Sequence, residues 1–173
     1  RLTILIEAMG RINFGQAIKD YKGITNDVLL KYQRNENEYD VNLKNWNITC
    51  IPDDYQTAIN ALNNKSKSST LNTKAGYYRG YFNIKKIGDT FLNFEEFGKG
   101  QVYVNGHTLG RIWSVGPQQT LFIPGCWLKK GRNEVVILDI TGPKNTVCEG
   151  FNKPELNKLN LDRPITHNDV NNK

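Results

Sequence analysis

Residues that build metal sites and nucleophilic centres are scarce in this chain. Its 173 residues include only two histidines, His107 and His167, and three cysteines. His167 falls in a polar tail, so we expect neither a metal site nor a Ser/His/Asp triad, and no cofactor. Cys50, Cys126 and Cys148 form no CxxC pair and no metal-ligand spacing. One disulfide with one free thiol, or three buried thiols, both agree with the sequence.

Long apolar runs are also absent. No run is long enough to span a membrane, and no basic segment followed by an apolar one opens the chain. We therefore expect no membrane insertion. Because the chain begins on Arg1 and not on Met, we expect a piece of a longer protein, with any export signal upstream.

The net charge of +6 comes from cations that are scattered along the chain. Lys85 and Lys86 lie close to Asp89 in sequence, and the pair at 129–130 lies close to Glu134. This interleaving predicts a solvated surface of mixed charge and no nucleic-acid partner.

Short alternating runs dominate the region from residue 77 to residue 143. They are split by Gly, Pro and the pair Asn105-Gly106, which favours a two-residue type I′ hairpin turn. Period-two alternation with such punctuation is typical of an antiparallel β-sandwich. Strands are predicted at 77–84, 90–94, 101–104, 120–123 and 134–140, with a further one at 146–151.

The first part of the chain is less regular. Strands are predicted at 2–7, 28–30 and 46–49, and a loop or exposed hairpin at 33–42. One helix is predicted after Pro52, because Asp53 and Asp54 can accept hydrogen bonds from its free amides. Its apolar face has helical spacing: Tyr55, Ala58, Ile59 and Leu62. An exposed loop is expected at 63–73.

Several motifs in the second half resemble one family closely. They are the sequences GDTFL at 88–92, KGQVYVNG at 99–106, LGRIW at 109–113 and GPQQTL at 116–121. Together they resemble the C-terminal jelly-roll domain of β-galactosidases of glycoside hydrolase family 35. The segments LIEAMGRINFG at 5–15 and KGI at 22–24 resemble part of a first sandwich of that family.

The resemblance implies an all-β fold, an antiparallel jelly-roll β-sandwich with one short connecting helix. It also implies a division of the chain. Residues 1–51 would end a preceding β-sandwich, and 52–74 would form the helix and an exposed linker. Residues 75–151 would be the galactose-binding-like jelly roll, and 152–173 a polar tail.

Family 35 enzymes are retaining glycosidases, which need two carboxylates about 5–5.5 Å apart. Glu95 and Glu96 are adjacent in an expected solvated turn, and no segment resembles the barrel strands that carry the catalytic glutamates. We therefore expect no catalytic residue here and no activity from this chain alone. The resemblance implies an accessory region that braces the catalytic barrel of the same polypeptide, in a periplasmic or secreted enzyme, or a lysosomal one in a eukaryote.

The alternatives are an independent carbohydrate-binding module for galactosides and a purely structural β-domain. Sugar contact would use an aromatic face with polar groups around it. The candidates are Trp113, Arg111, Tyr103 and His107, with galactoside glycans as the partner. The competing interpretations are structural packing for Trp113 and an ordinary exposed turn residue for His107. Trp127 is expected in the core.

Overall fold

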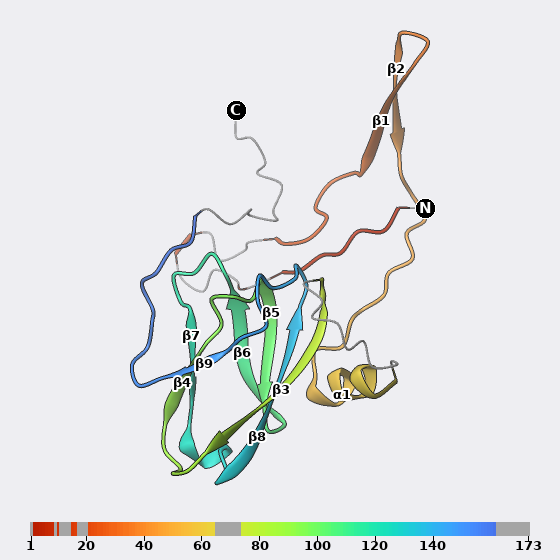
Figure 1. Ribbon diagram of the computed structural model, residues 1–173. Coiled ribbons are helices and arrows are strands. Elements are labelled where there is room, and N and C mark those ends of the chain that lie inside the picture. The colour runs from red at the N-terminus through yellow and green to blue at the C-terminus, as the bar shows by residue number, and fades with distance from the viewer. Residues whose placement is uncertain (1, 9, 11–14, 17–20, 65–73, 162–173) are drawn as a thin grey trace. The chain divides into compact units, whose positions relative to one another are not determined.

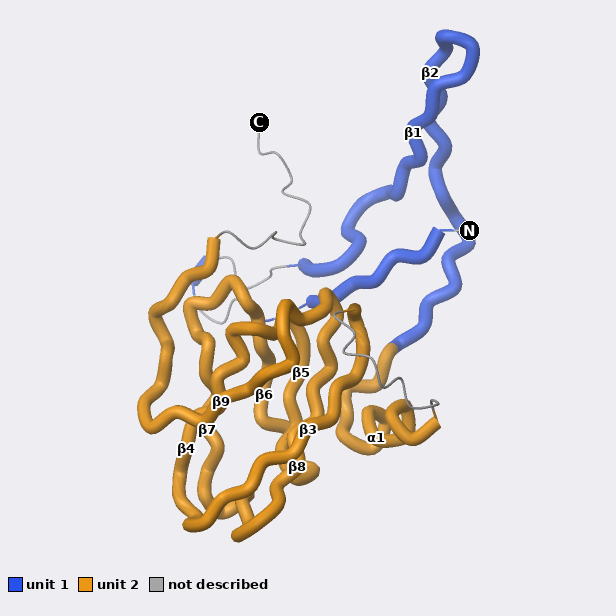
Figure 2. Tube along the Cα trace, in the orientation of Figure 1, with its two compact units in different colours: residues 1–50 blue, residues 51–173 orange. Residues whose placement is uncertain are grey.

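The computed structural model describes residues 2–8, 10, 15–16, 21–64 and 74–161. The chain divides into two compact units, residues 1–50 and 51–173 (Figure 2). Parts of the expected first-sandwich motif (residues 9 and 11–14), most of the expected loop (65–73) and the tail from 162, with His167, lie outside the described residues.

Two antiparallel sheets form the second unit (Figure 1). The four-stranded sheet has the order β3 (Gly76–Ile84), β8 (Gly131–Asp139), β5 (Lys99–Val104), β6 (His107–Trp113). The three-stranded sheet has the order β7 (Thr120–Ile123), β4 (Thr90–Asn93), β9 (Glu149–Phe151). The predicted all-β sandwich is therefore confirmed. The strands predicted for this unit reappear, most of them with shifted ends, and β6 follows the predicted hairpin turn at Asn105-Gly106, although no range was predicted for it.

The main core lies between these two sheets. Val102 and Val104 of β5 contribute to it, whereas Tyr103 between them faces the other way. Successive side chains of a strand point to opposite faces, so every second residue of β5 faces the core. The other buried residues of this core come from both sheets and from the segments that connect their strands: Leu92, Phe94, Phe97, Ile112, Leu121, Ile123, Leu128, Val135 and Ile137.

A second, smaller cluster lies on the outer face of the four-stranded sheet. There the helix α1 (Tyr55–Asn64) packs on Tyr103, Val136 and Tyr77, with Ala58 at the centre of the contact. The amide of Thr57 donates to Asp54 Oδ1 at 2.9 Å, which caps the first turn as the sequence predicts. The backbone hydrogen bond from Thr57 also lowers the pKa of Asp54.

The turn between β5 and β6 has the conformation that its sequence favours. Asn105 and Gly106 have φ values of 48° and 87°. A type I′ turn requires positive φ at both central residues, so the prediction is confirmed.

The described part of the first unit contains one hairpin, β1 (Leu29–Arg34) paired with β2 (Asn37–Asn42). The expected exposed hairpin is confirmed, and the strand expected at 28–30 is the start of β1. The strands expected at 2–7 and 46–49 are wrong, because both segments are irregular. A strand needs a neighbour to pair its backbone amides and carbonyls, and neither segment has one among the described residues.

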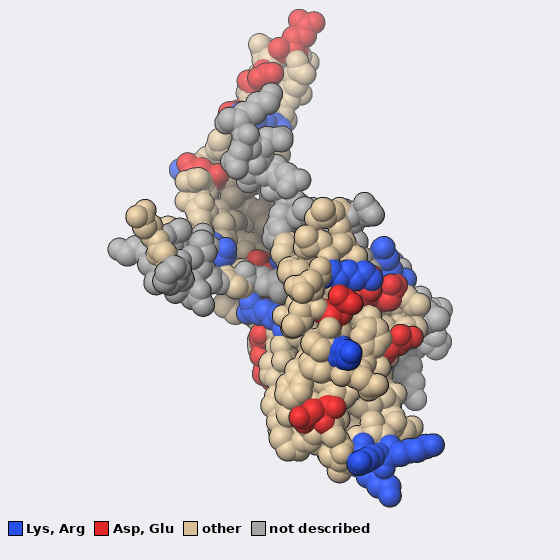
Figure 3. All heavy atoms as spheres, turned by 90° about the vertical axis from the view of Figure 1, so that its left-hand side faces the viewer, with Lys and Arg blue, Asp and Glu red and all other residues tan. Residues whose placement is uncertain are grey.

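Charged side chains of both signs are spread over the face shown in Figure 3. The exception is the lower end of the sandwich, where β3 ends and β8 begins in Figure 1 and where blue spheres gather in Figure 3.

Candidate functional site

A tight turn after β4 carries two adjacent carboxylates. Its sequence is Phe94-Glu95-Glu96-Phe97, and the Phe97 amide donates to the Phe94 carbonyl at 2.9 Å. Both phenylalanines are buried, with ring centroids 6.2 Å apart. Because the flanking rings occupy the core, the two glutamates between them project outward. The expected turn is confirmed, but its glutamates are half-buried and not fully solvated.

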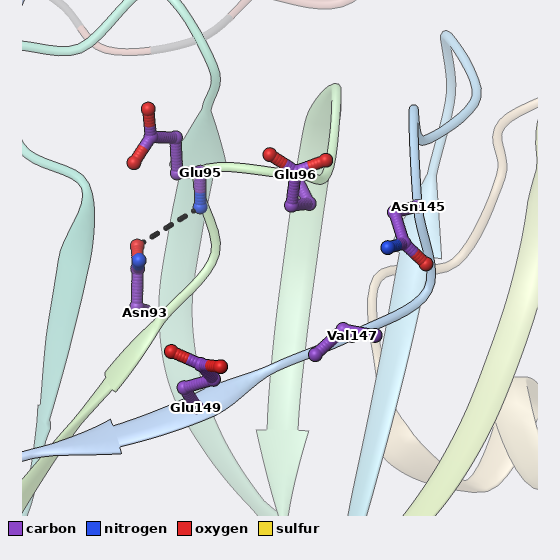
Figure 4. A pocket seen from close by; sticks show the side chains of 6 residues that line it. All are labelled: Asn93, Glu95, Glu96, Asn145, Val147 and Glu149. Carbon is purple, nitrogen blue, oxygen red and sulfur yellow. Dashed lines mark hydrogen bonds between the residues drawn. The ribbon is translucent and has the colours of Figure 1, made fainter.

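These glutamates line a pocket of about 270 Å³ (Figure 4). Asn93, Asn145, Val147 and Glu149 complete the lining. Asn93 Oδ1 accepts a hydrogen bond from the Glu95 amide at 3.0 Å, as the dashed line shows. The amide of Lys144 donates to the Glu96 carbonyl at 2.8 Å, which joins the turn to the segment before β9. The lining is polar, with carboxylate and amide groups that can bond to hydroxyls.

Glu95 already has an ionic partner. Lys158 Nζ lies 2.7 Å from Glu95 Oε1 and 2.8 Å from Oε2. The hydrogen bond to Glu95 raises the pKa of the Lys158 ammonium. A carboxylate beside a cation favours its ionised form and is a poor proton donor. Glu95 therefore does not have the properties of the acid in a retaining pair.

Asp139, at the end of β8, has a structural role. It is fully buried, and its carboxylate accepts hydrogen bonds from the amides of Gly98 at 2.6 Å, Lys99 at 3.4 Å, Thr141 at 3.0 Å and Gly142 at 2.8 Å. A carboxylate that satisfies four backbone donors in the interior fixes the two chain segments that carry them.

Tyr103, one of the expected sugar contacts, lies beneath helix α1. Its side chain is only 1% exposed, and its hydroxyl donates to Asp53 Oδ1 at 2.7 Å. Burial, together with the bond to Asp53, raises the pKa of Tyr103. The phenol thus joins the sheet to the start of the helix.

Trp113 and Arg111 lie at the far end of β6 and share a face. Lys99 pairs with Trp113 and Gln101 with Arg111, on the face opposite Val102. The ammonium of Lys99 lies 5.1 Å from the Trp113 ring centroid, a cation–π distance. Trp113 is half-buried and Arg111 is exposed.

His107 lies at the other end of the same strand. It stacks on Trp127 with ring centroids 4.6 Å apart and an interplanar angle of 12°. His107 is exposed. Trp127 is half-exposed, so the expectation that it lies in the core is wrong. Asn105 holds this corner, since its Nδ2 donates to the Trp127 carbonyl at 2.8 Å.

The structure therefore brings together only Trp113 and Arg111 among the expected sugar contacts. His107 is at the opposite end of β6, and Tyr103 is under the helix. None of the four lines the pocket. The sequence signal available for the pocket is the pair of adjacent carboxylates between two apolar residues, Phe94 and Phe97, whereas Lys158 lies 63 positions from its partner Glu95 and gives no signal.

All three cysteines are unpaired. Cys50 and Cys126 are exposed, and burial raises the pKa of the Cys148 thiol to about 12. Over the residues that the structure describes, no group of three or more His, Cys, Asp or Glu side chains is arranged to hold a metal ion. No described helix has the length and apolar character needed to cross a membrane.

Two family models match the chain. Residues 75–133 match the galactose-binding domain of β-galactosidase, and residues 1–51 match the first all-β domain of β-galactosidase.

Individual relatives agree with these matches. The chain is 37% identical to β-galactosidase 1 of Dictyostelium discoideum over 142 residues, which are 80% of this chain and 20% of the relative. It is 36% identical to human β-galactosidase-1-like protein 2 over 145 residues, 81% of this chain and 21% of the relative. Bovine β-galactosidase is 33% identical over 180 residues, 88% of this chain and 26% of the relative. The chain thus spans about a fifth to a quarter of the length of these relatives.

Proposed function

This chain belongs to the β-sandwich region of the glycoside hydrolase family 35 β-galactosidases, and we propose that it is a non-catalytic accessory region that braces a catalytic barrel. The whole enzyme would remove terminal β-linked galactose by a retaining, two-carboxylate mechanism. The bracing surface would include residues 1–51, the end of a preceding sandwich. Residues 52–74 would serve as a connecting segment, 75–151 as the jelly roll and 152–173 as a tail.

The observation that carries this proposal is the two-sided hairpin β1–β2. Cross-strand partners share a face of a sheet, so Leu30 with Val41 and Tyr32 with Tyr39 lie on one face. These four side chains are between 42% and 49% exposed, and the two tyrosine rings stack with centroids 5.2 Å apart.

The opposite face of the hairpin is polar in its central part. Lys31 Nζ lies 3.5 Å from Asp40 Oδ2, and Gln33 pairs with Glu38. This separation of apolar and polar side chains is the pattern of a sheet with one buried face. A two-stranded sheet alone is marginally stable in water, so its apolar face calls for a covering layer. The relatives are four to five times as long as their match to this chain, which leaves ample polypeptide to supply that layer.

A chimera tests the proposal. The matching segment of the Dictyostelium relative would be replaced by this chain, and aryl-galactoside hydrolysis would be followed after heating. We expect Tyr32→Ser with Tyr39→Ser to shorten the half-life of activity several-fold, with little change in kcat/KM before heating. The matched control is Lys31→Ser with Asp40→Ser on the polar face, which should change neither quantity. Equal effects of the two double variants would contradict a bracing role for the apolar face.

The second candidate function is an independent galactoside-binding module. The pocket beside Glu95 and Glu96 favours it, because carboxylates and amides there can bond to sugar hydroxyls. Trp113 and Arg111 would offer a second contact surface, and His107 a third. Tyr103 would need helix α1 to move aside. Titration of the isolated chain with lactose, followed by NMR, distinguishes the two functions, since a brace alone predicts no saturable shifts.

The cellular location follows from the same proposal. A β-galactosidase of this family would act in the periplasm or outside the cell, or in the lysosome of a eukaryote. Fractionation of the producing cells, with antibodies against this chain, tests that assignment.

A further inference from the structure

One end of the sandwich concentrates positive charge. The backbone register pairs Ile84 with Gly131 and Asn83 with Arg132. Lys85 and Lys86 directly follow the end of β3, and Lys129 and Lys130 directly precede the start of β8. Two loops that are far apart in sequence therefore bring their cations to the same end of the sandwich. With Arg132 they form what we call the basic end, and all five are exposed: Lys85, Lys86, Lys129, Lys130 and Arg132. Blue spheres gather at this end in Figure 3.

The acidic residues that lie close to these lysines in the sequence bond to other groups. Asp89 Oδ1 accepts a hydrogen bond from the Gly125 amide at 2.8 Å. Glu134 forms an ion pair with Arg79 at 3.4 Å and a hydrogen bond with the Tyr55 hydroxyl. Within the part of the chain that the structure describes, no carboxylate lies within salt-bridge distance of the five cations. The interleaved charges of the sequence therefore form no ion pair at this end among the described residues.

The loop that carries two of the lysines is held in one shape. Asn133 is fully buried, and its Oδ1 accepts a hydrogen bond from the Lys129 amide at 2.9 Å. Its Nδ2 donates to the carbonyls of Lys129 at 2.8 Å and Gly131 at 3.0 Å. Asn105 Nδ2 donates to the same Oδ1 at 2.8 Å, which ties the loop to the β5–β6 turn. A preformed loop loses less entropy when it binds a ligand.

Arg132 adds a flat donor to the basic end. Its guanidinium carbon lies 3.6 Å from the ring centroid of Tyr81, which is itself 48% exposed. The stacked guanidinium is restricted in orientation, and its edge N–H groups can bond to two oxygens of one sulfate or carboxylate. An exposed aromatic ring beside a cation suits a sugar that carries such a group.

We propose that the basic end binds an anionic polysaccharide that carries sulfate or carboxylate groups. The choice of a polysaccharide over other polyanions rests on the proposed function, whereas the charge and the preformed loop do not. This surface is separate from the acidic pocket, whose lining residues share none of its members.

The test uses the full 173-residue chain and heparin as the sulfated probe, with polygalacturonate as the carboxylated one. One variant changes Lys85, Lys86, Lys129 and Lys130 to Gln. The matched control changes four other exposed lysines to Gln: Lys44, Lys74, Lys144 and Lys153. Both variants lose the same charge. Circular dichroism and thermal midpoints verify that each remains folded.

We expect the basic-end variant to bind heparin at least tenfold more weakly than the wild type, and the control to change affinity less than threefold. Counterion release gives a slope of log K against log salt of roughly 0.7–0.9 per contact, so the loss of four lysines should reduce the slope by about three in the basic-end variant only. Arg132→Lys keeps the charge but loses the paired N–H donors of the guanidinium, so it should weaken heparin binding by a smaller factor than the basic-end variant does.

Equal losses of heparin affinity in both quadruple variants, or no binding of either probe, would overturn the site. Equally tight binding of duplex DNA would overturn the assignment to polysaccharides. None of these readouts depends on galactosidase activity, so the bracing role is tested separately.

Discussion

The Tyr103 hydroxyl donates a 2.7 Å hydrogen bond to Asp53, a residue 50 positions earlier in the chain. A second phenol, that of Tyr55, bonds to Glu134 on β8. One bond runs from the sheet to the start of the helix and the other from the helix to the sheet. Helix α1 is therefore fixed to the outer face by two phenol–carboxylate bonds around the small apolar contact centred on Ala58.

These bonds predict a loss of stability at alkaline pH. The hydrogen bond to Glu134 raises the pKa of Tyr55 to about 12, and burial raises that of Tyr103 further. Above the unfolded-state pKa of about 10, the unfolded chain releases phenolic protons that the folded chain keeps, so the free energy of unfolding falls as pH rises. We expect the urea midpoint to be level below pH 10 and to decline between pH 10 and 12. Tyr55→Phe with Tyr103→Phe should reduce that decline.

The control for this series is Tyr21→Phe, at a tyrosine that is 81% exposed. It should leave the alkaline decline as in the wild type. Absorbance at 295 nm, recorded in parallel, reports phenol ionisation directly. If the double variant declined as steeply as the wild type, other groups would be responsible for the pH dependence.

Gly106 should tolerate substitution poorly. Its φ of 87° lies in the left-handed region, which is strained for a β-branched residue. We expect Gly106→Val to lower the free energy of unfolding by roughly 1–3 kcal/mol, measured by urea denaturation. Gly88→Val is the matched control, because Gly88 is exposed and a Cβ there meets nothing within 4 Å. A midpoint for Gly106→Val equal to that of the control would show that the turn does not constrain the fold.

Local patterns predicted the parts of the fold that depend on local chemistry. The capping carboxylate of Asp54 and the spacing of the apolar face were enough to place helix α1. The hairpin turn predicted at Asn105-Gly106 implies a strand after it, but the pattern of β6 itself is too irregular to give its range. The pairing of β5 and β6 shifts register between Val102 and Tyr103, which leaves Leu109 as an extra residue, and Gly110 has no side chain to show the alternation.

Long-range features could not be predicted in the same way. Residues 4–6 are consecutive apolar residues, a pattern typical of a strand, but strand formation also depends on a neighbour that the sequence does not identify. The pocket combines the turn after β4 with Asn145 and Glu149, about 50 positions later, and no local pattern joins them. The basic end has the opposite cause, because acids that lie close to its lysines in sequence do not bond to them in space. Asp89 and Glu134 are directed instead to Gly125 and Arg79.

The three thiols should react at different rates. Cys50 and Cys126 are exposed, whereas burial raises the pKa of Cys148 to about 12, so very little of its thiolate forms at pH 8. We expect a maleimide reagent to label two thiols of the native chain and a third only after unfolding in urea. Mass spectrometry of the peptides identifies each site. Rapid native labelling of Cys148 would contradict its burial.

The purified chain alone should not hydrolyse galactosides. A retaining mechanism needs one carboxyl that can donate a proton and a second that can act as nucleophile, about 5–5.5 Å apart. Glu95 is paired with Lys158, and Asp139 accepts hydrogen bonds from four backbone amides in the interior. We expect no turnover of an aryl galactoside above the buffer rate, and no change with Glu95→Gln or Glu96→Gln. The Dictyostelium relative at equal molarity is the positive control. Turnover that survives repeated purification and is abolished by Glu96→Gln would show that the pocket is catalytic, and the chain would then be more than an accessory region.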